Sequence, residues 1–151
     1  TLDGDGQNPP GEIPKLLDAR DDAADPTIHL FAGERIKRQD SAVRRFTSRS
    51  ANTIRRWMLD DGVRDTGCSL KLFRRDTFLR LPYFDHMHRF IPALVLRTGA
   101  TLRTVPVDHR PRTRGSTKYG FHNRALAAIT DLIGVMWLRH RSRRPVFEPM
   151  D

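Results

Sequence analysis

Apolar residues in the first part of the chain recur at helical spacing and then at strand spacing. The apolar positions in 13–17 follow a pair of prolines, which predicts a helix that begins near Pro10 and ends in the acidic run 18–25. Residues 27–32 are rich in β-forming side chains and are followed by Gly33, which predicts a strand that stops there. The pattern indicates one helix–strand unit, followed by a polar, flexible segment.

A second apolar series predicts a longer helix in the middle of the chain. Ser41 suits the N-cap of this helix, and the run Asp60-Asp61-Gly62 predicts its end. The apolar residues that recur at helical spacing between them are Val43, Phe46, Ile54, Trp57 and Met58.

Short strands and short helices then alternate. Leu70 and Leu72 mark a short strand, and Asp76 suits the N-cap of a helical turn that follows it. Residues 90–97 predict a second short helix, and residues 101–107 a further strand. This alternation favours an α/β layered domain.

The last third of the chain combines a polar loop with an apolar helix. Residues 108–119 are rich in Arg, Pro, Gly and Ser, which predicts a long mobile loop. Residues 125–138 are strongly apolar but too few to span a bilayer. Three interpretations stay open: a core helix, an interfacial amphipathic helix, or the approach to a missing transmembrane span. The basic run 139–144 favours the second, and Asp131 disfavours deep burial in lipid.

Charge and composition narrow the classes of partner. The 151 residues are 38% hydrophobic, which suits one modest core, and 27 Lys and Arg against 18 Asp and Glu leave a net charge of +9. Polyanions are therefore the expected partners: nucleic acid, anionic lipid or a phosphorylated substrate. Cys68 is the single cysteine, which excludes a disulfide framework, fits a reducing cytoplasm and predicts a small packed residue.

The first residues of the chain carry candidate metal chemistry. Thr1-Leu2 has the character of the end of an apolar strand, so we expect an N-terminal part of the domain to be missing. Asp3-Gly4-Asp5 places two carboxylates on one strand-to-loop turn, where both can face a hard cation. Such a cation neutralises charge on a leaving diphosphate. The alternative for an isolated tripeptide is a solvated turn.

An ordered set of motifs resembles the family 2 glycosyltransferases, in particular the group similar to dolichyl-phosphate mannose synthase. The resemblance begins with the metal-binding signature at residues 3–10 and runs through most of the chain. The further motifs that carry it are Gly33-Glu34-Arg35, Asp65-Thr66-Gly67-Cys68-Ser69-Leu70-Lys71, His109-Arg110-Pro111-Arg112 and Gly115-Ser116-Thr117-Lys118-Tyr119-Gly120. Here Thr117 separates Ser116 from Lys118, a variation on the family's motif.

The resemblance implies an α/β fold, the C-terminal portion of a GT-A-type mixed sheet flanked by helices. Residues 1–120 would be the C-terminal part of the catalytic domain, without the nucleotide-binding half. Residues 121–144 would form the amphipathic or juxtamembrane helix with its basic end, and residues 145–151 a tail.

Functional roles follow from the resemblance together with the charge of each side chain. Cations aimed at phosphates are what this chemistry demands, because two polyanions must be held together. The candidates are Asp3, Asp5 and Gln7 for a Mg²⁺ or Mn²⁺ ion; Arg35, Arg112 and Lys118 for the donor phosphates; His88, Arg89, Arg110 and Ser116 for the acceptor phosphate; and Asp65 as the catalytic residue.

Two of these assignments have alternatives. Asp65 either orients the acceptor or a water, or caps its own loop through backbone hydrogen bonds. The segment Asp85-His86-Met87-His88 suggests a metal site, but no third soft ligand lies near, so an acceptor-side loop is favoured. The structural alternative for this segment is a surface loop anchored by Tyr83 and Phe84.

The implied function is transfer of a sugar from a nucleotide diphosphate donor, GDP- or UDP-linked, to a polyprenyl or dolichyl phosphate by an inverting displacement. The expected location is the cytoplasmic face of a bacterial inner membrane, peripheral or juxtamembrane. A basic nucleic-acid-binding module is the competing class, but the chain has no zinc-finger spacing, RNA-binding aromatic signature or helix-turn-helix, so no nucleic acid is expected as a partner. A third possibility is an inactive fragment, since residues 1–151 alone would offer the donor only its diphosphate end.

Overall fold

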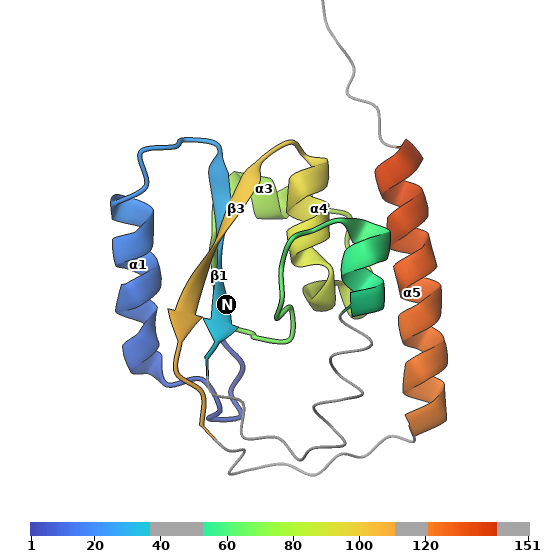
Figure 1. The fold of residues 1–151 in the computed structure, drawn as a ribbon, viewed down its shortest axis with the longest axis horizontal. Helices are drawn as coiled ribbons and strands as arrows, with labels where there is room; N and C mark the ends of the chain where they lie inside the picture. The colour runs from blue at the N-terminus through green and yellow to red at the C-terminus, as the bar shows by residue number, and fades with distance from the viewer. Residues whose placement is uncertain (37–52, 111–120, 142–151) are drawn as a thin grey trace, which may run out of the picture.

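Three strands form a mixed sheet in the order β2–β1–β3. The computed structural model describes residues 1–36, 53–110 and 121–141 (Figure 1). The strands are β1 (Ile28–Arg35), β2 (Lys71–Phe73) and β3 (Thr101–Val107). β1 pairs with β2 in antiparallel fashion and with β3 in parallel, so the carboxyl ends of β1 and β3 reach the same edge of the sheet.

β1 is the central strand, and its length corrects the sequence prediction. The strand does not stop at Gly33 but continues through Arg35. A Cβ at Gly33 would lie 3.0 Å from Cys68 Sγ, 3.0 Å from the Leu70 carbonyl oxygen and 3.1 Å from a methyl of Val107. Glycine therefore serves close packing within the strand rather than a break, because a Cβ at these distances would force its neighbours to move.

One face of the sheet is covered by a single helix. A 3₁₀ turn, η1 (Pro10–Glu12), leads into α1 (Ile13–Asp21), which confirms the predicted helix entered through prolines and ended in acidic residues. Leu16 of α1 is fully buried against the face of the sheet that carries Phe31. Cys68 packs in the same cluster, as predicted for a small apolar residue.

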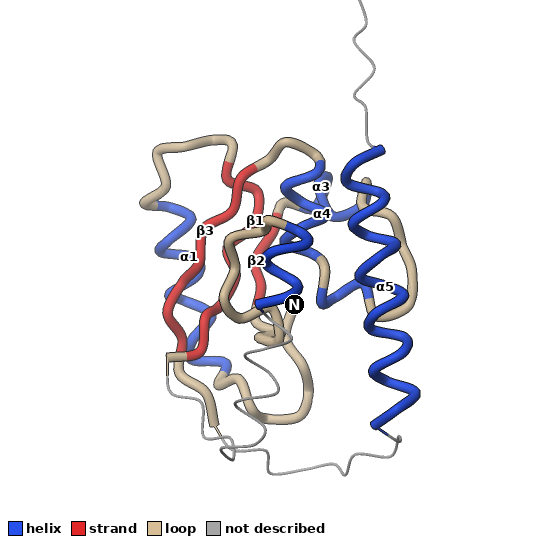
Figure 2. The backbone as a smooth tube through the Cα atoms, turned by 45° about the vertical axis from the view of Figure 1, so that its right-hand side comes forward, coloured by secondary structure: helices blue, strands red, loops and turns tan. Residues whose placement is uncertain are grey.

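The other face is covered by several helices (Figure 2). They are a helical segment at residues 53–59, α3 (Arg75–Leu79), η2 (Met87–Arg89), α4 (Ile91–Arg97) and α5 (Phe121–Arg141). The predicted helix at 90–97 and strand at 101–107 are confirmed. The N-cap prediction for Asp76 is wrong, because α3 begins at Arg75 and Arg74 is its N-cap, two residues before Asp76.

The helical segment 53–59 turns a different face inward from the one that its apolar residues suggest. Ile54 is 53% exposed and Trp57 is 85% exposed, whereas Arg55 and Leu59 are buried. The segment ends at Leu59, close to the predicted end. Predictions for Ser41, Val43 and Phe46 lie outside the described residues.

Arg55 is buried because it has a set of polar partners within its own neighbourhood. One guanidinium nitrogen donates to the Asp61 carboxylate, and another donates to the Val63 carbonyl oxygen at 2.5 Å. Asp61 in turn accepts the Val63 backbone N–H at 3.2 Å. Burial raises the pKa of Asp61, while the Arg55 charge acts in the opposite direction.

α5 is a core helix on one face and an apolar surface on the other. Val135 is 2% exposed and joins the core cluster, with Leu132, Met136 and Leu138 packed against it. The opposite face leaves a stripe of three large apolar side chains in solvent: Ile129 is 56%, Ile133 50% and Trp137 60% exposed. Among the described residues, no helix combines the length and apolar character needed to cross a bilayer.

Candidate active site

The candidate residues gather at the edge of the sheet where the parallel strands β1 and β3 end. In α/β sheets ligands bind outside the carboxyl ends of the strands, where the chain emerges into loops. Four segments meet at this edge: the loop 3–8, the end of β1 at Arg35, the loop 65–71, and residues 108–110 after β3 (Figure 1). Segments far apart in the sequence thus supply one site.

The loop 3–8 is held in shape by its own backbone. The Asp5 carboxylate accepts the Gln7 backbone N–H at 3.1 Å, and Gly6 between them has φ 75°. The Gln7 carbonyl oxygen accepts the Arg110 backbone N–H at 2.8 Å, which ties the loop to the end of β3. Asp3 is exposed, so its carboxylate faces solvent at the open edge.

This loop fits a hard divalent cation by the chemistry of its donors. Asp3, Asp5 and Gln7 supply oxygen ligands only, which suit Mg²⁺ or Mn²⁺. Across residues 1–36, 53–110 and 121–141, no group of three or more His, Cys, Asp or Glu side chains comes together as an all-protein metal cage. Mg²⁺ usually keeps several waters and accepts only one or two protein carboxylates.

Arg35 and Asp65, predicted as separate functional residues, bond to each other. Arg35 Nε donates to one Asp65 oxygen at 2.5 Å and an Arg35 Nη donates to the other at 2.6 Å, in a bidentate pair. The other Arg35 Nη lies 3.4 Å from His109 Nε2. A Cβ at Gly67 would lie 3.0 Å from the guanidinium, so glycine leaves room for the pair. Asp65 therefore orients Arg35, rather than only capping its own loop.

His88 is an exposed residue in the middle of η2. This turn begins directly after His86, whose φ of 64° is left-handed. Burial, the Arg89 guanidinium and the Lys71 ammonium together lower the pKa of His88, and the Asp3 carboxylate acts in the opposite direction. A neutral imidazole donates one hydrogen bond instead of providing a full positive charge. The phosphate contact of His88 stays a prediction, and with a neutral imidazole it would be a hydrogen bond rather than an ion pair.

The structure bears out one half of the expected Tyr83 and Phe84 anchor. Tyr83 is 89% exposed, whereas Phe84 packs against the core cluster beside the buried Met87 and Phe90. His86 Nδ1 lies 3.7 Å from Asp131 on α5. The presence of Asp131 in the apolar helix is thus explained by its orientation toward the protein.

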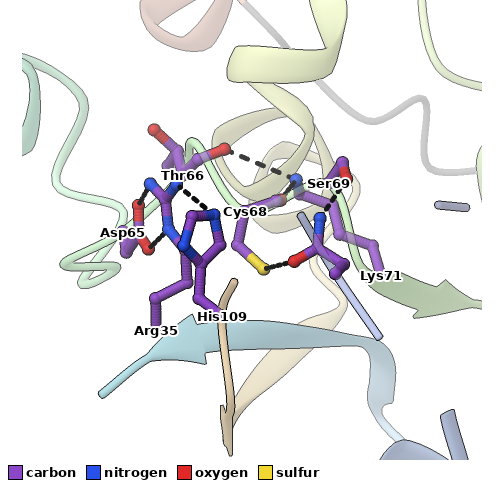
Figure 3. Close-up of polar contacts among 8 residues, drawn as sticks. Arg35, Asp65, Thr66, Cys68, Ser69, Lys71 and His109 are labelled. Atoms are coloured by element: carbon purple, nitrogen blue, oxygen red, sulfur yellow. Dashed lines mark hydrogen bonds and ion pairs between the residues drawn. The ribbon is translucent and has the colours of Figure 1, made fainter. Parts of the chain in front are cut away.

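Lys71 is a buried cation that sequence reasoning did not single out. It is 5% exposed, and its ammonium donates to the carbonyl oxygens of Cys68 and, at 3.4 Å, Thr66 (Figure 3). Burial lowers the pKa of Lys71. The loop 65–71 is therefore wrapped around this side chain. Strand alternation places Lys71 on the opposite face from Leu70 and Leu72, where a lysine usually meets solvent, so the sequence pattern gave no signal of its burial.

Some predicted residues are not part of this geometry. Arg112, Ser116 and Lys118 lie outside the described residues. Arg110 contributes its backbone N–H to Gln7, and its side chain is exposed. Arg89 is half-buried in η2 beside His88.

The chain is similar over most of its length to curated bacterial sugar transferases. It is 33% identical over 148 residues to a dodecaprenyl-phosphate galacturonate synthase of Rhizobium johnstonii, an alignment that covers 96% of this chain and 43% of that protein. It is 35% identical over 125 residues to an undecaprenyl-phosphate 4-deoxy-4-formamido-L-arabinose transferase of Shewanella sediminis, which covers 82% and 36%. A protein of the same name from Salmonella newport is 35% identical over 136 residues, covering 88% and 39%. No protein-family model and no solved structure matches the chain.

The names of these relatives describe one class of enzyme, sugar transferases that use polyprenyl phosphates. The chain is a homologue of the family 2 polyprenyl-phosphate glycosyltransferases over most of its length, which confirms the resemblance seen in the sequence. It spans 36–43% of the length of the first relatives named above.

Proposed function

We propose that this chain forms the catalytic edge of a GT-A-type glycosyltransferase that moves a sugar from a nucleotide diphosphate to a polyprenyl phosphate. The observation that carries the proposal is the meeting of the oxygen-donor loop 3–8 with the loop 65–71 and its Arg35–Asp65 pair at one sheet edge. The named activities of the homologous enzymes support the acceptor class. The mixed, helix-flanked sheet is compatible with part of a GT-A domain.

The reaction is a single inverting displacement at the anomeric carbon of the donor. An oxygen of the acceptor phosphate forms the new bond to this carbon while the bond to the donor diphosphate breaks. The lipid phosphate needs little help from a general base, because a phosphate monoester has its second pKa near about 6. The enzyme's main tasks are to hold two polyanions together and to stabilise the leaving group.

The residues of the edge divide these tasks. Asp3, Asp5 and Gln7 would hold Mg²⁺ or Mn²⁺, which when bound neutralises charge on the leaving diphosphate. Arg35, aimed by Asp65, contacts the donor phosphates. Proposed alongside them are Arg112 and Lys118 for the donor phosphates, and His88, Arg89, Arg110 and Ser116 for the acceptor phosphate.

The metal loop is tested by Asp5→Asn in the full-length protein. Transfer to polyprenyl phosphate, measured with radiolabelled donor across a Mn²⁺ titration, should fall by about 100-fold or more. Asp18→Asn, which makes the same change on the exposed surface of α1, should leave transfer unchanged. If the Asp5→Asn variant transfers sugar at the wild-type rate, the proposed mechanism is wrong.

The outer face of α5 suggests how the enzyme reaches its lipid. Ile129, Ile133 and Trp137 repeat every four residues along one stripe, and the last turn carries Arg139, His140 and Arg141. Apolar side chains beside cations favour the interface of an anionic membrane, where each cation adds about 1 kcal/mol. α5 thus lies on the membrane surface with Val135 toward the core.

Vesicle binding tests this orientation. Ile133→Asp should abolish sedimentation of the full-length protein with phosphatidylglycerol vesicles while leaving the thermal melt nearly unchanged, because Ile133 is half exposed. Leu79→Asp, the same kind of change at an exposed site on α3, is the control. Equal sedimentation of the wild type and the Ile133 variant, if the protein has no other membrane anchor, excludes α5 as the contact.

A further inference from the structure

One side-chain oxygen of the loop 65–71 binds both ends of the loop 3–8. Ser69 Oγ accepts the Asp3 backbone N–H at 3.1 Å and the Asn8 side-chain Nδ2–H at 2.8 Å. Asn8 is 6% exposed, and its Oδ1 accepts the thiol of Cys68 at 3.5 Å. A residue far along the chain therefore sets the spacing between the first and last residues of the candidate metal loop.

The two donors use the full accepting capacity of this oxygen. A hydroxyl oxygen has two lone pairs, and here one faces Asp3 and the other faces Asn8. Asp5 lies between these two points and is held by the Gln7 backbone. The distance between the Asp3 and Asp5 carboxylates thus depends on a closure that Ser69 makes.

Backbone contacts with neighbouring segments hold Ser69 in place. Its carbonyl oxygen accepts the Thr1 hydroxyl at 3.1 Å, and Thr1 exchanges two backbone hydrogen bonds with Lys71. The Lys71 ammonium donates hydrogen bonds to the carbonyl oxygens of Cys68 and Thr66 on the inner side of the same loop. Because these partners restrict Ser69 before any ligand arrives, the closure costs little ordering entropy when a ligand binds.

We propose that Ser69, with Asn8, is a positioning residue that sets the Asp3 and Asp5 carboxylates at the spacing a divalent cation requires. The inference rests on the proposed function, because it assigns the metal to this loop. Groups that orient metal ligands from outside the coordination sphere commonly change metal affinity by about 10–100-fold when removed.

Direct binding of Mn²⁺ alone to the full-length protein tests the inference without turnover. The free ion is measured by electron paramagnetic resonance. Ser69→Ala should weaken binding by about 10–100-fold, and Ser69→Thr, which keeps the hydroxyl, should restore it to within a few-fold. Thr98→Ala removes a hydroxyl bonded to the Val95 carbonyl at the end of α4 and should leave binding unchanged.

Because Ser69 and Asn8 share one hydrogen bond, their substitutions should have non-additive effects on Mn²⁺ affinity. Asn8→Ala breaks the same closure, so the variant lacking both side chains should bind Mn²⁺ about as weakly as the weaker single variant. Additive losses would show that the two residues act separately and would overturn the proposal. If the alanine variants do not fold by circular dichroism, Ser69→Cys keeps the size of the side chain with a weaker acceptor and should show the same direction of change.

The outcomes separate the inference from the proposed function. If the wild-type protein does not bind Mn²⁺, the metal assignment itself fails. If the wild type binds Mn²⁺ and Ser69→Ala binds it equally well, the metal site stands and the positioning role of Ser69 is wrong.

Discussion

Two arginine–aspartate pairs in this molecule have the same chemistry but different surroundings. Arg55 and Asp61 are six residues apart, and both also bond to the Val63 backbone, so all the members of this cluster lie within one short segment. Arg35 and Asp65 are thirty residues apart and join β1 to the loop 65–71, with His109 from a third segment beside them.

The difference shows that the location of an ion pair decides its role. The Asp61 side chain is completely buried, and the pair lies between the helical segment 53–59 and the loop behind it. The Arg35–Asp65 pair is nearly as buried, with side chains 12% and 7% exposed against 8% and 0% for the other pair, but it lies at the edge of the sheet where loops converge. The closed pair is therefore expected to hold the fold, and the edge pair to shape the site.

Removal of the Asp61 charge from the buried Arg55–Asp61 pair should have the largest effect on stability. Asp61→Asn leaves the buried Arg55 guanidinium without its carboxylate, so the free energy of unfolding should fall by about 3 kcal/mol or more. Urea denaturation of the full-length protein measures this loss. Replacing both partners, with Arg55→Met and Asp61→Leu, should recover most of it, because no unpaired charge remains buried. A double variant as unstable as the single one would contradict this reading.

The same substitution at the edge pair should act on activity more than on stability. Asp65→Asn turns an amide toward Arg35 and misdirects the guanidinium, so transfer per folded molecule should fall by about 10–100-fold. The free energy of unfolding should fall by only about 1–3 kcal/mol. Initial rates corrected for the folded fraction measure the effect, with Asp61→Asn as the matched control. Equal loss of corrected activity in the two variants would remove the distinction between the pairs.

Local patterns predicted much of the fold. The helix entered at Pro10, the helix at 91–97 and the strand at 101–107 follow from spacing, prolines and β-forming residues, which act over a few neighbours. A strand end at Gly33 and an inward-facing Trp57 are among the expectations that failed, because contacts outside each segment decide them. Gly33 meets Cys68 and Val107 across the sheet, and Trp57 is outside because Arg55 has carboxylate and carbonyl partners inside.

The candidate site was predicted as separate residues rather than as an arrangement. Asp3, Asp5, Arg35 and Asp65 were identified from short motifs and a family resemblance. That Arg35 and Asp65 bond to each other, and that burial, Arg89 and Lys71 lower the pKa of His88, depend on contacts between distant segments. No spacing in the sequence encodes them.

The sequence by itself determined the local elements, the excess of positive charge and the homology to polyprenyl-phosphate sugar transferases. These depend on side-chain type and on short-range order. Only the tertiary structure decided that Ser69 closes the loop around Asp3 and Asp5, and that Lys71 holds the loop beneath it. The physical reason is that hydrogen bonds and burial depend on which segments meet in space, and folding brings residues 3 and 69 together across 66 positions of chain.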